Sequence, residues 1–388
     1  MSVQALLLPL LVLLLADSPR QAARDTVPAR DVQAAIEKLG SLEFETRMEA
    51  SRTVRRASAD VAAPLLHRAV AGHADGYVRY RALVLLSGFN DPRTRETMAS
   101  VLDDKNDRLR AVAYAYFEHH PDPQILPRLL GALEKEESEF VRPALTRALA
   151  AYGSDPRVRS TMTALALRGQ NFFRSVVIEA LGDHKAGYAL PTLTEIAKLE
   201  GPLQYDAVLA MGKIGDKKAL ETFVALQRGA PRSVQPAVAA AICLVGVNCA
   251  SHQGYLASTL TFAIQNPGYQ DLLRAAASAL AAVALEGGED AATELIVQGG
   301  PTRDPERAAI ALALGTVALR NATMILRLVE NERLAGPAIE LLHEAFDMLD
   351  EDFEEERFFV AVRRAYWQAS ENSPTRRAAE ALIRRLEF

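Results

Sequence analysis

The stretch Glu139–Pro156 reads EFVRPALTRALAAYGSDP, and it decides the fold. It predicts one helix that begins near Arg142 and ends at Gly153, because glycine readily takes the left-handed conformation that closes a helix. An arginine in a similar Val/Leu/Ala-rich context recurs along the chain at intervals of 31, 32 and 32 residues. A fixed period of this length is typical of stacked helical repeats. The recurring positions are Arg79, Arg110, Arg142 and Arg174.

Each repeat contains two predicted helices. The first often carries a proline in its first turn, as at Pro64, Pro127 and Pro191, where the missing N–H costs no intrahelical hydrogen bond. The second is the alanine- and leucine-rich helix of the opening stretch, and a turn with an aspartate that can cap the next helix follows it. β-Strand signals are nearly absent. The sequence therefore predicts an all-α chain with about nine to ten helix pairs over residues 31–345.

This pattern resembles HEAT repeats, and in its short period the HEAT-like repeats of the phycobilin-lyase group. The resemblance is carried by VRPAL at residues 141–145 with Gly153 and Asp155, and by their analogues in other units. It implies a right-handed α-solenoid, a superhelix whose concave face is built from the second helices and binds extended partners. It implies no particular activity, since a fold alone does not determine function.

The N-terminus has the features of a signal peptide over residues 1–23. Residues 5–16 are a 12-residue apolar run, which fits the hydrophobic region of a secretory signal. No Lys or Arg precedes the run, and the cleavage rule is met only loosely. The alternative is an apolar helix that docks on the first repeat of a cytoplasmic protein, which Pro9 disfavours. We expect a linker at residues 24–30 and a bacterial protein that is periplasmic or secreted.

The C-terminal residues 346–388 depart from the repeat. They begin with an acidic segment, residues 347–356, and continue as two predicted helices with paired arginines. We expect capping helices whose apolar side chains cover the last repeat and whose charges face water. A membrane or nucleic-acid role for the arginines is the alternative. The arginines are Arg363, Arg364, Arg376, Arg377, Arg384 and Arg385.

The recurring arginines have two interpretations. In the first they form a ladder between repeats, pairing with a turn aspartate of a neighbouring unit and with helix-end carbonyls, so that loss of one member leaves its partner uncompensated. In the second some of them face an acidic ligand in the concave groove. The ladder or concave-face candidates are Arg79, Arg110, Arg142, Arg174 and Arg274, with Asp91, Asp155, Asp183 and Asp216.

The chain has two cysteines, Cys243 and Cys249, on either side of a helix end at Gly246. In an exported protein an even number of cysteines suggests a disulfide. Six residues of unbroken helix would hold the two too far apart, but a helix break at Gly246 can bring them together. The alternative is a pair of independent buried thiols.

The histidines are scattered, and Glu118-His119-His120 is their one cluster. It precedes Pro121, so a solvated turn is the simplest interpretation and metal ligation the alternative. The HEAT-type deoxyhypusine hydroxylases bind two irons through several His-Glu pairs, whereas this chain has only His343-Glu344. We therefore expect no catalytic, cofactor-binding or metal-binding residues.

The composition and the missing motifs disfavour several classes of function. A net charge of −5 argues against a general nucleic-acid surface, and no apolar run reaches the roughly 18 residues of a membrane span. No Gly-rich phosphate loop or Gly-x-Ser-x-Gly nucleophile turn is present. The sequence favours a non-enzymatic scaffold that binds a protein or peptide on its concave face. We expect a monomer without cofactor, nucleic acid or, once mature, an integral membrane span. The alternatives are a lyase-like or metal-dependent enzyme, or an enzyme subunit, on the same fold, and a cytoplasmic adaptor.

Overall fold

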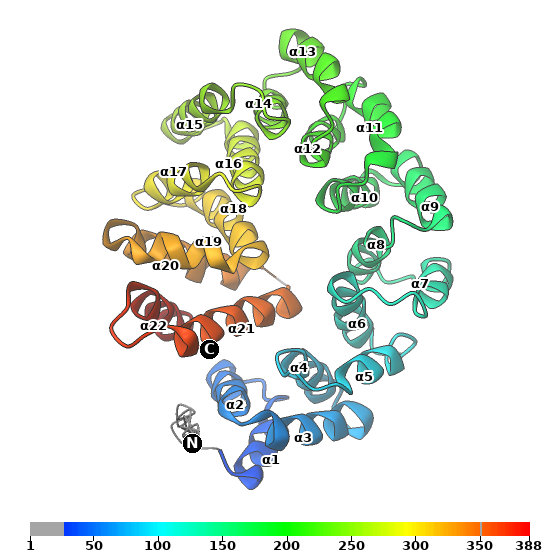
Figure 1. Ribbon diagram of the computed structural model, residues 1–388, viewed down its shortest axis with the longest axis vertical. Helices are drawn as coiled ribbons and strands as arrows, with labels where there is room; N and C mark the ends of the chain where they lie inside the picture. The colour runs from blue at the N-terminus through cyan, green and yellow to red at the C-terminus, as the bar shows by residue number, and fades with distance from the viewer. Residues whose placement is uncertain (1–26, 350) are drawn as a thin grey trace, which may run out of the picture.

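The computed structural model describes residues 27–349 and 351–388 (Figure 1). Over these residues it contains 22 α-helices, two short 3-10 helices and no strand, which confirms the all-α prediction. The predicted signal peptide and residues 24–26 of the predicted linker lie outside the described residues, and α1 begins within the remainder of the linker, at Ala29.

The helices come in pairs. The first members are α1 (Ala29–Lys38), α3 (Ala59–Gly72), α5 (Thr94–Ser100), α7 (Leu126–Leu133), α9 (Pro156–Leu167), α11 (Leu190–Ala197), α13 (Leu220–Gly229), α15 (Cys249–Gln265), α17 (Glu289–Gly299), α19 (Ala322–Glu330) and α21 (Asp352–Gln368). The second members are α2 (Phe44–Arg56), α4 (Gly76–Ser87), α6 (Asp107–His119), α8 (Arg142–Ala150), α10 (Asn171–Asp183), α12 (Gln204–Ile214), α14 (Gln235–Leu244), α16 (Gln270–Leu285), α18 (Glu306–Arg320), α20 (Glu332–Met348) and α22 (Pro374–Leu386). The 3-10 helices Gly187–Ala189 and Lys217–Ala219 precede α11 and α13.

The second helices form the inner layer of a solenoid. From α4 to α20 each packs on the next, and the first helices lie outside them (Figure 1). Glycine allows close approach in this layer: a Cβ on Gly182 would lie 2.7 Å from the Cα of Ala210, and one on Gly212 would lie 2.6 Å from the Cα of Ala241. One continuous core of buried apolar side chains runs through the stack. The predicted solenoid is confirmed.

The early prolines mostly lie where the sequence places them. Pro127 and Pro191 fall in the first turn of α7 and α11. Pro64 does not, because α3 begins at Ala59 and the proline lies inside the helix. That assignment was wrong by about one turn. The helix begins earlier than expected because Ser58, which has an extended backbone conformation, is its N-cap residue.

The solenoid closes on itself. α21 packs against α18 and α19, and also against α4 and α6 near the other end of the chain, while α22 packs on α19 and α20. Figure 1 shows the C-terminal helices beside α2 and α4, so the chain forms a ring. We call the contact of residues 351–388 with α2, α4 and α6 the seam. The predicted C-terminal cap therefore covers the first repeats as well as the last.

The acidic segment is only partly solvated, which corrects the expectation that its charges face water. Glu354 and Glu356 are each 2 % exposed. Glu356 Oε2 accepts a hydrogen bond from Arg55 Nε at 2.8 Å and lies 2.7 Å from Arg55 Nη2, across the seam. The carboxylates are buried because partners far away in the sequence compensate their charge. The predicted boundary at residue 346 also falls inside α20, which ends at Met348.

Among the described residues, no single helix has both the length and the apolar character to cross a membrane. The adjacent pair α18 and α19 meets those criteria only jointly, and it is bent by 114° at the break between the two helices.

Candidate functional site

The predicted arginine ladder exists in its first two members. Arg79 Nη2 lies 2.6 Å from Asp104 Oδ2, and its Nε donates to the carbonyl of Val70 at 2.8 Å. Arg110 Nη2 lies 2.7 Å from Glu136 Oε1. Each guanidinium thus joins its own repeat to the loop before the next inner helix. These two arginines hold neighbouring repeats together and do not face the groove as ligand-binding groups.

The other three arginines differ from these two. Arg142 lies over the ring of Phe173, 5.0 Å from its centroid. Arg174 Nε donates to the carbonyl of Ala166 at 2.9 Å. Arg274 is exposed and lies 3.7 Å from Asp271 of its own helix. The equivalent positions therefore do not form one uniform row of charge pairs.

The predicted aspartate partners were wrong. Asp155 and Asp216 accept hydrogen bonds from the backbone N–H two residues ahead, because they begin the next helix. Asp91 contacts Arg93 and His67, and Asp183 contacts Lys213. A hydrogen bond from Arg157 lowers the pKa of Asp155 to about 2. The ladder instead uses acids in the following loop, Asp104 and Glu136.

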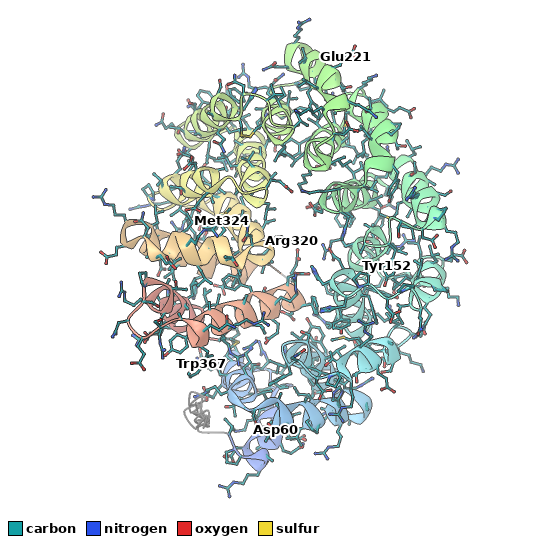
Figure 2. The ribbon with its side chains drawn as sticks, in the orientation of Figure 1. Asp60, Tyr152, Glu221, Arg320, Met324 and Trp367 are labelled. Atoms are coloured by element: carbon teal, nitrogen blue, oxygen red, sulfur yellow. A yellow bond between two sulfur atoms is a disulfide. The ribbon has the colours of Figure 1, made fainter. Side chains whose placement is uncertain are left out.

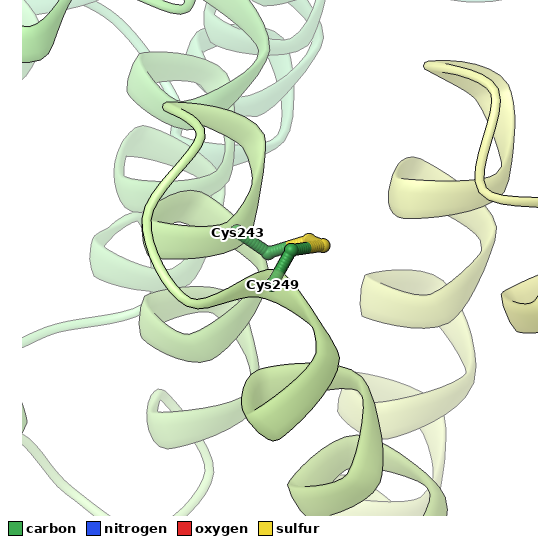
Figure 3. The surroundings of a disulfide bond; sticks show 2 residues. All are labelled: Cys243 and Cys249. Carbon is green, nitrogen blue, oxygen red and sulfur yellow. A yellow bond between two sulfur atoms is a disulfide. The ribbon is translucent and has the colours of Figure 1, made fainter.

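The structure joins Cys243 and Cys249 in a disulfide (Figure 3). α14 ends at Leu244, and the chain turns back through Gly246 and Asn248, which both have positive φ values of 82° and 45°. The two Cα atoms are consequently 4.1 Å apart, a separation that a continuous helix would not allow. The helix break at Gly246 is the feature on which the pairing depends.

Charged groups from distant repeats converge where the inner helices end. Glu118, in the last turn of α6, is buried and lies 3.2 Å from His184 Nε2 and 3.4 Å from Arg320 Nη1. Arg147 Nε lies 3.5 Å from Glu118 Oε2, and its Nη2 lies 3.8 Å from Glu351 at the seam. Figure 2 shows Arg320 on the inner side of the ring. We call Glu118, Arg147, His184, Arg320 and the groups bonded to them at the seam the polar hub.

The polar hub continues into the seam. His119 Nε2 lies 2.6 Å from Glu354 Oε1, and Arg357 Nη1 lies 2.9 Å from the same nitrogen. Burial alone would raise the pKa of Glu354, but the hydrogen bond with His119 and the charges of His119, Arg357 and Arg320 lower it to about 2. The pKa of Glu118 is also lowered, because His184, Arg320 and Arg147 outweigh the effect of its burial.

The cluster Glu118, His119 and Glu354 could in principle hold a metal ion, since one ligand atom from each lies within 4.8 Å of the others. Two guanidinium groups argue against this use. Arg357 already contacts His119 and Glu354, and Arg320 contacts Glu118. A divalent cation bound here would be repelled by both guanidinium groups unless it displaced them. The residues fit an ion-pair network better than a metal centre.

The expectation of a solvated turn at Glu118-His119-His120 was wrong for Glu118 and His119. Both lie in the last turn of α6, against groups that are 66 and 235 residues away in the sequence. The signal available in the sequence was a charged residue at the end of an otherwise apolar inner helix. This pattern also marks Lys213 and Arg320.

A second feature is a row of exposed aromatic side chains at or just before the start of the inner helices α4, α8 and α10. Tyr77, Phe140 and Phe172 occupy equivalent positions, each two residues before a recurring arginine, and are 50 %, 43 % and 61 % exposed. Arg108 takes the same position in the repeat between the first two, with its guanidinium carbon 5.7 Å from the Tyr77 ring centroid and 5.4 Å from that of Phe140. We call these four residues the aromatic row. The row was not predicted, although its signal in the sequence is an aromatic residue two positions before the recurring arginine in three repeats.

One end of the aromatic row, Phe140 and Phe172, borders a groove of about 390 Å³ between α4–α10 and the junction of α20 with α21. Its floor is apolar and includes Val112, Ala115 and Ala144, and Leu349 and Phe353 form part of the facing wall. Phe140 and Phe172 line it on the side of the inner helices. A volume of this size is within the range of binding sites for small molecules or side chains. The groove is the candidate functional site.

Comparison with known proteins supports the repeat assignment. Residues 100–182 match the model of a family described as HEAT repeats. Among solved structures, the CpcE–CpcF complex of phycocyanin lyase from Nostoc sp. is 17 % identical, with 67 % of this chain and 97 % of that chain covered and a TM-score of 0.40. A structure of Kap95p with RanGDP is 15 % identical, with 92 % and 55 % covered and a TM-score of 0.44. At these sequence identities and TM-scores, the functions of those proteins are not assigned to this chain. No curated protein matches the sequence.

Proposed function

We propose that this HEAT-repeat protein is a non-enzymatic scaffold that binds a protein segment on the concave face of its solenoid. The observation that carries the proposal is the aromatic row, whose exposed Phe140 and Phe172 line a groove with an apolar floor and whose Tyr77 and Arg108 continue the row beyond it. Aromatic residues and arginine are enriched among the side chains that dominate binding energy at protein interfaces. Exposed apolar groups of this kind, gathered beside a groove, are typical of binding surfaces.

The closed ring limits which part of the concave face a partner can reach. α21 covers part of the concave face, against α4 and α6, so a partner would have access to the groove beside α21 and not to the whole inner surface. This differs from an open superhelix, in which every inner helix faces the partner. A partner would therefore contact few repeats, and binding would depend on a small number of side chains.

Crosslinking in the native host, followed by mass spectrometry, tests the proposed function. A photoreactive amino acid at Phe172 should crosslink to a specific partner protein, because this side chain is 61 % exposed at the groove. The matched control is the same amino acid at Val297, which is 54 % exposed on α17. Equal crosslinking patterns from both positions, or none from either, would reject the scaffold.

A metal-dependent enzyme is the second candidate function, and only the Glu118–His119–Glu354 cluster favours it. Metal analysis of the purified protein decides between the two. The scaffold predicts no stoichiometric metal. Stoichiometric metal that is lost in Glu354→Gln would instead support the enzyme.

We also propose that the protein works outside the cytoplasm. The 12-residue apolar run near the N-terminus and a disulfide within the solenoid support this location, since stable disulfides are typical of oxidising compartments. Fractionation of the host and intact-mass measurement test the proposal. Cleavage should remove about 23 residues, as expected for a secretory signal, whereas a cytoplasmic chain that retains Met1 would reject it.

A further inference from the structure

The aromatic row is organised in advance for binding. The guanidinium of Arg108 lies over the rings of Tyr77, Tyr80 and Phe140, at 5.7, 5.5 and 5.4 Å from their centroids. Phe172 packs edge-on against Phe173, with centroids 5.3 Å apart. Aromatic side chains have few rotatable bonds, and these contacts restrict them further. Binding of a partner would therefore cost these side chains little further conformational entropy.

The charge of the groove indicates what kind of partner it accepts. Four carboxylates line it, on Glu139, Glu351, Asp352 and Glu354, against one guanidinium, on Arg147. Arg147 lies near Glu118 and Glu351, and His119 and Arg357 pair with Glu354. Glu139 and Asp352 carry the remaining charge of the lining, which is negative and complements Lys or Arg.

One acceptor in the lining has no hydrogen bond. Among the described residues none donates a hydrogen bond to the buried Glu351 Oε2, and Arg147 Nη2 lies 3.8 Å from it. Glu139, at the opposite rim, is exposed. The Glu351 side chain as a whole is 30 % exposed, so its carboxylate can be approached from the groove even though Oε2 is buried. Both rims thus present a carboxylate to a cationic side chain.

The spacing of the row sets the conformation of the partner. Successive members of the row come from neighbouring inner helices, and packed helices lie roughly 8–10 Å apart. A chain in the extended polyproline II conformation advances about 3.1 Å per residue and has three residues per turn, so every third side chain lies on the same face. Contact points in such a partner therefore fall about every third residue.

We propose that the aromatic row and the groove beside it bind a basic segment of a partner protein in the extended polyproline II conformation, with an apolar side chain about every third residue. The apolar side chains contact Phe140 and Phe172, and the basic side chains between them pair with Glu139 and Glu351. This inference rests on the proposed function and names the chemistry of the partner.

Fluorescence anisotropy with defined peptides tests the inference. The probe is a labelled peptide of four Leu-Lys-Ser repeats. One control peptide has four Leu-Glu-Ser repeats, and another has the composition of the probe with its leucines together at one end. We expect the probe to bind at least about tenfold more tightly than either control, as expected where both charge and spacing contribute. Equal affinity for the three peptides would overturn the inference, and preference for the glutamate peptide would reverse its charge assignment.

Variants of the protein locate the site. Phe140→Ala combined with Phe172→Ala should weaken binding of the probe by roughly 30-fold or more, as for truncation of dominant interface residues. Glu139→Lys should weaken binding of the lysine peptide and strengthen binding of the glutamate peptide. The matched control is Phe262→Ala, because Phe262 is 42 % exposed on α15, away from the groove. Unchanged affinity in the double variant, with an unchanged melting temperature, would overturn the site.

The crosslinking experiment separates this inference from the proposed function. If wild-type protein crosslinks a specific partner and the double variant, probed elsewhere on the concave face, retains it, the scaffold stands and the assigned surface is wrong. If the probe binds the aromatic row but no host protein is crosslinked, the chemistry of the site stands and the scaffold fails. A second copy of this chain as the crosslinked species would overturn the basic-segment inference.

Discussion

Between neighbouring inner helices the contacts are apolar and close, as where Gly212 lies against Ala241, whereas at the seam Arg55 and Glu356, 301 residues apart, meet as a buried ion pair. The first kind of contact repeats along the stack, and each repeat needs only its neighbours. The second occurs where the ends of the solenoid meet. The difference implies that the seam can be weakened without unfolding the stack, and the following predictions test this separation.

The largest expected effect is at the seam. Glu356→Ala leaves the buried guanidinium of Arg55 without its carboxylate, and should cost about 3–5 kcal/mol of the free energy of unfolding at this interface. Urea unfolding measures the loss, and hydrogen exchange should show lost protection in α21 and α22 first. The control replaces both partners, Arg55→Leu with Glu356→Leu, and should recover much of the loss. Uniform loss of protection across the ring would contradict the separation.

Acid should weaken the same interface. The pKa of Glu354 is lowered from 4.5 to about 2 in the folded protein. Because the folded value is the lower one, the ionised carboxylate stabilises the fold above about pH 4.5, and this contribution is lost as the pH falls toward 2. The contribution is on the order of 3 kcal/mol. Unfolding measured between pH 6 and 2 should show a steeper loss in wild type than in Glu354→Gln. Parallel curves would contradict the assignment.

The stack should respond to added volume in a smaller and more local way. Gly212→Ala places a Cβ 2.6 Å from the Cα of Ala241, so α12 and α14 must separate, at a cost of about 1–3 kcal/mol. The matched control is Gly131→Ala in α7, where no atom lies within 4 Å of the added Cβ. That variant should gain about 0.5–1 kcal/mol. Thermal melting compares the two, and equal effects would show that close helix approach is not what Gly212 provides.

The smallest expected effect concerns an exposed pair. Lys185 Nζ lies 2.7 Å from Glu286 Oε2, 101 residues away, and both side chains are more than one-third exposed. A double-mutant cycle with Lys185→Ala and Glu286→Ala should give a coupling of at most about 1 kcal/mol, because solvent screens the pair. A coupling as large as that of Arg55 with Glu356 would show that sequence separation, and not burial, distinguishes the two regions.

Much of the fold could be predicted because it depends on local patterns. The period of Arg79, Arg110 and Arg142, with glycine at helix ends, indicates helix pairs that stack on their neighbours. The closing of the ring could not be predicted in this way. It depends on the accumulated curvature of the ten helix pairs from α1 to α20, to which every interhelix angle contributes, and no local pattern encodes that sum.

The candidate site shows the same limit. The recurrence of Phe140 and Phe172 two residues before Arg142 and Arg174 can be read from the sequence. The groove beside them exists only because Leu349 and Glu351 come to face α6 and α8. Likewise, Asp104 and Glu136 pair with the ladder arginines because of where their loops pass, which spacing alone does not show.

The sequence by itself determined the class of this protein: helices of fixed period, each with an apolar face that a neighbour must cover. Only the tertiary structure decided which charges are buried, where the concave face stays open, and that residue 55 meets residue 356. The physical reason is range. Helix periodicity and capping act within a few residues, whereas burial and charge compensation act between any groups that the curvature of the whole ring brings together.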